Sequence, residues 1–184
     1  VFGQYNNAGG ARVAGGANDW ANVVCSKRGG DAGTWETVLE MNTAGTTIVR
    51  HCHAVYQDPY TLEWRICYGY QQTSAFYVWD GIHSIPPNTR ARDAAQYKGW
   101  RGMDLSNNPT GDYNTGQVTT LIFTPDELII PIDHGFTAAR GVYALSRDLK
   151  SYTQIYGGNP LNHSLYASCV DPVTGTALMS ELIE

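Results

Sequence analysis

A strict alternation of side chains between residues 62 and 70 constrains this chain more than any other feature. Large apolar residues occupy every second position and Glu63, Arg65, Cys67 and Gly69 lie between them; the apolar set is Leu62, Trp64, Ile66, Tyr68 and Tyr70. A period of two is typical of a β-strand with one buried face. The stretch 47–56 is rich in β-forming residues, and Asp58-Pro59-Tyr60-Thr61 follows it as a turn with proline at the second position. The sequence therefore predicts a β-hairpin over about residues 46–71.

The cysteines suggest how this hairpin is fastened. If the turn is centred between Pro59 and Tyr60, Cys52 lies directly across from Cys67, which predicts a Cys52–Cys67 disulfide and leaves Cys25–Cys169 as the second. Four cysteines with no Cys-x-x-Cys spacing are typical of a secreted protein with two disulfides. Four reduced thiols in a cytosolic protein are the alternative.

The rest of the chain adds a second hairpin and a helix. A hairpin is predicted over about 118–132, with its turn at 124–127, and a main helix over about 137–151, where apolar residues recur at helical spacing. A short helix carrying Cys25 is predicted after Asn18, although a strand over 21–25 is also compatible. We therefore expect an α+β fold with an antiparallel sheet. We expect a single domain over 1–184, in which 1–17 form an irregular arm rich in glycine and asparagine.

Composition excludes some classes and favours a compartment. The net charge is −5, so the basic excess of a nucleic-acid-binding protein is missing. No apolar run is long enough to cross a membrane. The chain begins at Val1, which suits a processed secreted protein, and Asn162-His163-Ser164 is an acceptor for N-linked glycan. A secreted, extracellular glycoprotein is the expectation.

Two histidines are the first candidates for chemistry. His51 and His53 are two residues apart on a predicted strand, so both imidazoles project from one face. Such a pair can perform acid-base catalysis, can bind a metal with further ligands from Asp133, His134 or His83, or can be ordinary polar positions of a sheet. Glu63 is a further candidate for proton transfer, although it lies on the other face of the hairpin. No nucleotide or cofactor motif is present, and we expect no cofactor.

The aromatic composition favours recognition. Twelve tyrosines stand against four phenylalanines, so many rings are expected to keep one edge near water or polar partners. The leading hypothesis is a secreted, disulfide-stabilised interaction protein, such as a microbial effector, toxin or lectin-like binder, whose partner is a host protein or carbohydrate. The alternative is a small secreted hydrolase of ribonuclease type that acts on RNA through His51 and His53.

Overall fold

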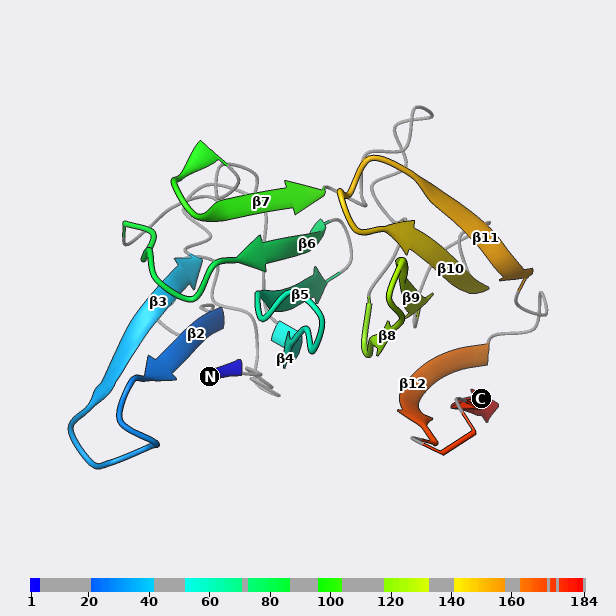
Figure 1. The fold of residues 1–184 in the computed structure, drawn as a ribbon, viewed down its shortest axis with the longest axis horizontal. Coiled ribbons are helices and arrows are strands. Elements are labelled where there is room, and N and C mark those ends of the chain that lie inside the picture. Colours follow the sequence, from blue (N-terminus) through cyan, green and yellow to red (C-terminus); the bar gives the residue numbers. More distant parts are fainter. Residues whose placement is uncertain are drawn as a thin grey trace, which may run out of the picture.

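The described part of the chain consists of antiparallel β-strands (Figure 1). The structure is a computed structural model that describes residues 1–3, 21–41, 52–70, 73–86, 96–103, 118–132, 141–157, 163–171, 173–174 and 176–183. Its strands are β1 (Phe2–Gly3), β2 (Ala21–Ser26), β3 (Trp35–Met41), β4 (Cys52–Gln57), β5 (Trp64–Tyr70), β6 (Thr73–Trp79), β7 (Trp100–Met103), β8 (Ile122–Phe123), β9 (Glu127–Ile132), β10 (Gly141–Ser146), β11 (Tyr152–Gly157), β12 (His163–Val170) and β13 (Ala177–Ile183).

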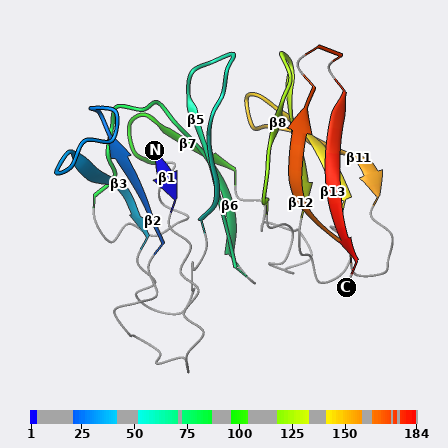
Figure 2. The ribbon, with the colours of Figure 1, turned by 90° about the horizontal axis from the view of Figure 1, so that it is seen from below.

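The strands form four sheets arranged in layers. The sheets have the orders β1-β2-β3, β4-β5-β6-β7, β11-β10-β9-β8 and β12-β13. Figures 1 and 2 show the β4–β7 sheet in the middle, with β1–β3 on one side and β8–β11 on the other, and β12 contacts β8 and β9. The β4–β7 sheet is thus covered on both faces.

Each face of the middle sheet has its own apolar core. On one face Ile66, Tyr77, Trp79 and Trp100 pack with residues of the β1–β3 sheet, among them Val23 and Leu39. On the other face Cys67, Phe76 and Val78 pack with residues of the β8–β11 sheet, among them Leu128, Ile130 and Leu145. Because successive residues of a strand point to opposite faces, β4, β5 and β6 each contribute side chains to both cores.

Both predicted hairpins are confirmed in the described residues, but the first has a different register. Phe123 lies opposite Leu128 in the second hairpin. In the first, the N–H of Asp58 donates to the carbonyl of Glu63 at 2.8 Å, and the loop closes at Leu62 with a φ of 62°. This loop is longer than the turn that the sequence suggested, so Ala54, and not Cys52, lies opposite Cys67.

The predicted disulfides are wrong. Cys25, Cys52 and Cys67 carry thiols. The β4–β5 ladder shifts register between Cys52 and Ala54, and this bulge turns Cys52 into the core shared with β1–β3, whereas Cys67 lies in the other core. The Cys25–Cys169 pairing fails because β2 and β12 lie on opposite sides of the middle sheet (Figure 2).

The predicted main helix over 137–151 is also wrong where the structure describes it. Residues 141–146 form β10, 147–150 a turn, and β11 begins at Tyr152. Val142 and Leu145 lie on opposite faces of β10, and both are buried. A strand covered on both faces loses the period of two, and its apolar residues then imitate helical spacing.

The N-terminal prediction is resolved in favour of the strand. Residues 21–26 form β2, in which Val23 and Cys25 point inward, so the predicted short helix is wrong there. The described residues contain no α-helix, and the predicted α+β class is therefore not found in them. Of the predicted arm over 1–17, only residues 1–3 are described, and Phe2–Gly3 pair with β2. No helix in the described ranges is long and apolar enough to span a membrane.

Candidate functional site

The residues predicted to carry chemistry do not gather at one place. His51, Asp133 and His134 lie outside the described residues. His53 lies half-buried at the bulge of β4, whereas Glu63 lies in the loop before β5. Trp64, the residue after Glu63, lies opposite Gln57 of β4. His53 is four residues before Gln57 on the same strand, which is about 13 Å at the usual rise of a strand. The structure therefore does not join His53 and Glu63 in one site.

Glu63 instead belongs to a charged cluster at the loop end of the hairpin. The cluster consists of Asp58, Glu63, Arg65, Arg101 and Arg147. Asp58 and Arg65 are fully buried, and Arg65 Nη2 donates to Asp58 Oδ2 at 2.7 Å. Glu63 Oε2 accepts from Arg65 Nη1 at 3.2 Å and from Arg101 Nη2 at 2.8 Å. Arg65 Nε is buried with no hydrogen-bond partner, so this cation depends on the two carboxylates for its compensation.

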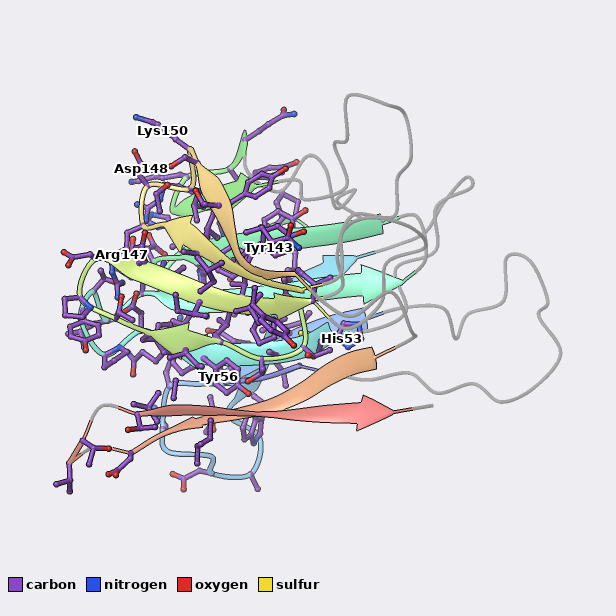
Figure 3. All side chains as sticks on the ribbon, turned by 90° about the vertical axis from the view of Figure 1, so that its right-hand side faces the viewer. His53, Tyr56, Tyr143, Arg147, Asp148 and Lys150 are labelled. Carbon is purple, nitrogen blue, oxygen red and sulfur yellow. The ribbon has the colours of Figure 1, made fainter. Side chains whose placement is uncertain are left out.

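Arg147 fastens three turns together at this end. It lies in the β10–β11 turn, and its Nη1 donates to Asp58 Oδ2 in the β4–β5 loop. Its Nε donates to the carbonyl of Pro125 at 2.8 Å and its Nη2 to the carbonyl of Thr124, both in the β8–β9 turn. Figure 3 shows Arg147 at the end of the molecule where these turns lie, with His53 toward the other end of the strands.

The surroundings of Asp58 fix its ionisation. Burial by itself would raise the pKa of Asp58, but the backbone N–H of Tyr60 and the guanidinium groups of Arg147 and Arg65 outweigh it, and the pKa lies below its ordinary value. Asp58 is therefore a carboxylate at neutral pH, and its acceptor atoms are already occupied. This cluster thus holds the turns in place.

Two apolar side chains project above the charged cluster. Tyr60 is 54% exposed and Leu62 is 67% exposed. The guanidinium carbon of Arg147 lies 5.0 Å from the centroid of the Tyr60 ring, a cation–π contact that fixes the ring while leaving half of it in solvent. We call Tyr60, Leu62 and Arg147 the turn surface.

A second arrangement, in the loop after β6, escaped the sequence analysis. His83 Nδ1 lies 2.6 Å from Asp80 Oδ2. The sequence suggests His83 only as a further ligand for a metal ion bound by His51 and His53. The spacing Asp80-Gly81-Ile82-His83 is the one signal in the sequence, because aspartate often bonds the backbone two residues ahead in a turn.

The described residues do not favour metal or thiol chemistry. They contain no group of three or more His, Cys, Asp or Glu that could hold a metal ion. Burial, followed by the neighbouring Cys52, raises the pKa of Cys67 well above its ordinary value, which keeps this thiol protonated and unreactive.

Comparison with known proteins found no matching family model, no matching curated protein and no matching solved structure. The chemistry and placement of the chain's own residues are therefore the basis for inferring its function.

Proposed function

We propose that this chain is an interaction protein that binds a protein partner through the turn surface. The observation that carries the proposal is that Arg147 fastens three turns while Tyr60 and Leu62 stay exposed above it. Tyrosine and arginine are enriched among the residues that supply most of the energy in protein interfaces. Leu62 beside Tyr60 favours a protein over a carbohydrate, because an isolated aliphatic side chain gains most from an apolar partner.

The fastening of the turns supports binding energetically. An interface that must order its side chains on binding loses about 0.5–1.5 kcal/mol for each flexible side chain that it immobilises. Here the Tyr60 ring is already held by Arg147, and Asp58 accepts from the backbone N–H of Tyr60 at 2.9 Å. The Tyr60 ring is thus ordered before the partner arrives.

Exposed aromatic side chains also lie on β11 and provide the matched comparison. Tyr152, Ile155 and Tyr156 are each more than half exposed on this edge strand. Tyr143 packs edge-on against Tyr152, with ring centroids 5.8 Å apart. Within the described residues, the contact found for Tyr152 is with the Tyr143 ring and not with a charged group. Tyr60, which Arg147 and Asp58 both contact, is the better-ordered of the two exposed tyrosines.

Substitution of the two tyrosines tests the proposal. Tyr60 and Tyr152 are both 54% exposed, so Tyr60→Ser and Tyr152→Ser remove the same ring at the same exposure. Peptides selected from a displayed library on the wild type are expected to lose at least tenfold in affinity, about 1.4 kcal/mol, on Tyr60→Ser or Leu62→Ser and to keep it on Tyr152→Ser. Binding is measured by biolayer interferometry, with near-UV circular dichroism as the control for folding.

Two outcomes would contradict this proposal. If the selected peptides bind the Tyr60→Ser/Leu62→Ser double variant as well as the wild type, the turn surface is not the binding site. If a glycan array gives binding that Tyr60→Ser abolishes while no peptide binds, the partner is a carbohydrate and the protein-partner proposal is wrong.

The ribonuclease-like alternative stays a prediction. It requires His51 and His53 together, and His51 lies outside the described residues. His53 is half-buried in β4 at a distance from Glu63 along the strand. RNA cleavage by the wild type and by a His51→Ala/His53→Ala variant would test it directly.

A further inference from the structure

The loop that follows β6 holds one imidazole in a fixed position. Asp80 Oδ1 accepts the backbone N–H groups of Ile82 at 2.8 Å and of His83 at 3.1 Å. The other oxygen, Oδ2, lies 2.6 Å from Nδ1 of the His83 ring. One carboxylate thus fixes both the backbone turn and the ring, and these contacts lower the pKa of Asp80 against the effect of its own burial.

The backbone of His83 is held from the other side by two tryptophans. The indole N–H groups of Trp79 and Trp100 both donate to the carbonyl of His83, at 2.8 and 2.6 Å. The two indole rings stack with centroids 5.7 Å apart in the core. His83 is therefore tied to the most rigid part of the middle sheet while its side chain stays 33% exposed.

Gly99 makes room for this arrangement. The N–H of Asp80 donates to the carbonyl of Gly99 at 3.0 Å. A Cβ at position 99 would lie 2.3 Å from Asp80 Oδ2, and the φ of Gly99 is 80°. The chain therefore approaches the carboxylate more closely here than any residue with a side chain allows.

The contacts determine which nitrogen of His83 can react. An ionised carboxylate only accepts hydrogen bonds, so the short contact to Asp80 places the imidazole proton on Nδ1. The lone pair is then on Nε2, and a carboxylate that orients and stabilises an imidazole in this way is the arrangement used in hydrolytic dyads and triads. Each of the two loops of the site carries one exposed apolar side chain, Ile82 at 68% and Tyr97 at 37%, and side chains of this kind favour an aromatic ring as a ligand group.

We propose that Asp80 and His83 form a hydrolytic site for small aromatic esters. Nε2 of His83 takes a proton from water while the water oxygen forms a bond to the ester carbonyl carbon. The tetrahedral intermediate then breaks its bond to the leaving oxygen, and the imidazolium returns the proton to that oxygen. The products are the carboxylic acid and the alcohol, and no oxidant, reductant or further reactant is needed. His83 is the catalytic residue and Asp80 a positioning residue.

Hydrolysis of para-nitrophenyl acetate tests this site in the intact chain. The wild type is expected to show saturation and a second-order rate constant about 100-fold above that of free imidazole. His83→Gln should reduce the rate to the background, whereas His163→Gln, the matched change at a described histidine of β12, should leave it unchanged. Asp80→Asn should reduce kcat at least about tenfold and leave KM near the wild-type value, because the carboxylate no longer orients the imidazole.

Near-UV circular dichroism of the stacked tryptophans shows whether each variant is folded. A wild-type rate equal to that of equimolar imidazole would overturn the proposal whether or not the variants fold. So would a folded His83→Gln variant with the wild-type rate, and so would a folded Asp80→Asn variant with an unchanged kcat.

Discussion

Substituting Asp58 by asparagine tests what holds the middle and β8–β11 sheets together at the turn end. Asp58→Asn keeps the size of the side chain and an acceptor for the N–H of Tyr60, but it removes the charge that faces Arg65 and Arg147. Arg65 is 1% exposed in its side chain, and its Nε has no partner. The variant therefore leaves a buried cation with only Glu63, at 3.2 Å, as its counter-charge.

The expected loss follows from the cost of an uncompensated buried charge. Removing one partner of a buried ion pair destabilises a protein by about 3–5 kcal/mol. The lower figure applies here, because Glu63 still neutralises part of the charge on Arg65. With a urea dependence of about 2 kcal/mol per molar for a chain of this size, a loss of 3 kcal/mol moves the unfolding midpoint down by about 1.5 M.

Urea unfolding followed by tryptophan fluorescence measures this shift. Glu36→Gln is the control, because it breaks the exposed pair with Lys27 at 2.7 Å, which should leave the midpoint unchanged. If Asp58→Asn does not fold, Arg147→Met provides the test, since it removes the contacts to the two neighbouring turns but keeps the Asp58–Arg65 pair. A midpoint within about 0.3 M of the wild type in either variant would refute the assignment of this cluster as the fastening between the sheets.

Three further outcomes are expected. The pKa of Asp58 is lowered in the folded protein. The stabilisation that its charge gives to the fold is therefore complete above the ordinary aspartate pKa of about 3.9 and is lost as the pH falls through the lower folded value. Asp58→Asn should lose stability less steeply than the wild type below about pH 4 in an acid titration. Gly99→Ala should be strongly destabilised in thermal unfolding, because its Cβ would collide with the carboxylate of Asp80, whereas an unchanged midpoint would contradict the close approach. A thiol reagent should modify Cys52 and Cys67 only as fast as the protein unfolds, because both thiols are buried; rapid modification in the native state, or a Cys52–Cys67 crosslink found by peptide mapping, would be inconsistent with their placement in separate cores.

The hairpins were predictable because the signals that specify them are local. Alternation from Leu62 to Tyr70 and the proline turns at Pro59 and Pro125 depend on neighbours in sequence. The predicted helix failed because β10 is covered on both faces, and its burial pattern is decided by sheets that the local sequence does not reveal. The predicted disulfide failed for two reasons: the longer loop puts Ala54 opposite Cys67, and the bulge moves Cys52 to the other face.

The candidate sites were harder to predict than the strands. Arg147 contacts Asp58 across 89 positions of the chain, and no spacing in the sequence indicates such a pair. The Asp80–His83 pair is local, yet its importance depends on Trp100 and Gly99, which β7 brings beside it. Sequence patterns thus indicated which segments form strands, whereas the side chains that meet at the ends of those strands depend on the layering of the sheets.

The bulge in β11 has a consequence for how the molecule behaves among copies of itself. Tyr152 lies opposite Leu145 and Tyr156 opposite Val142, with Ile155 left over between them, so the two tyrosines point to opposite faces of the sheet. A regular strand from another copy would not pair evenly along the bulged β11. This uncharged strand, at the edge of its sheet in the described residues, is therefore a poor template for pairing between copies. Deleting Ile155 is expected to restore a continuous ladder and to make this strand a better template for pairing between copies of the chain.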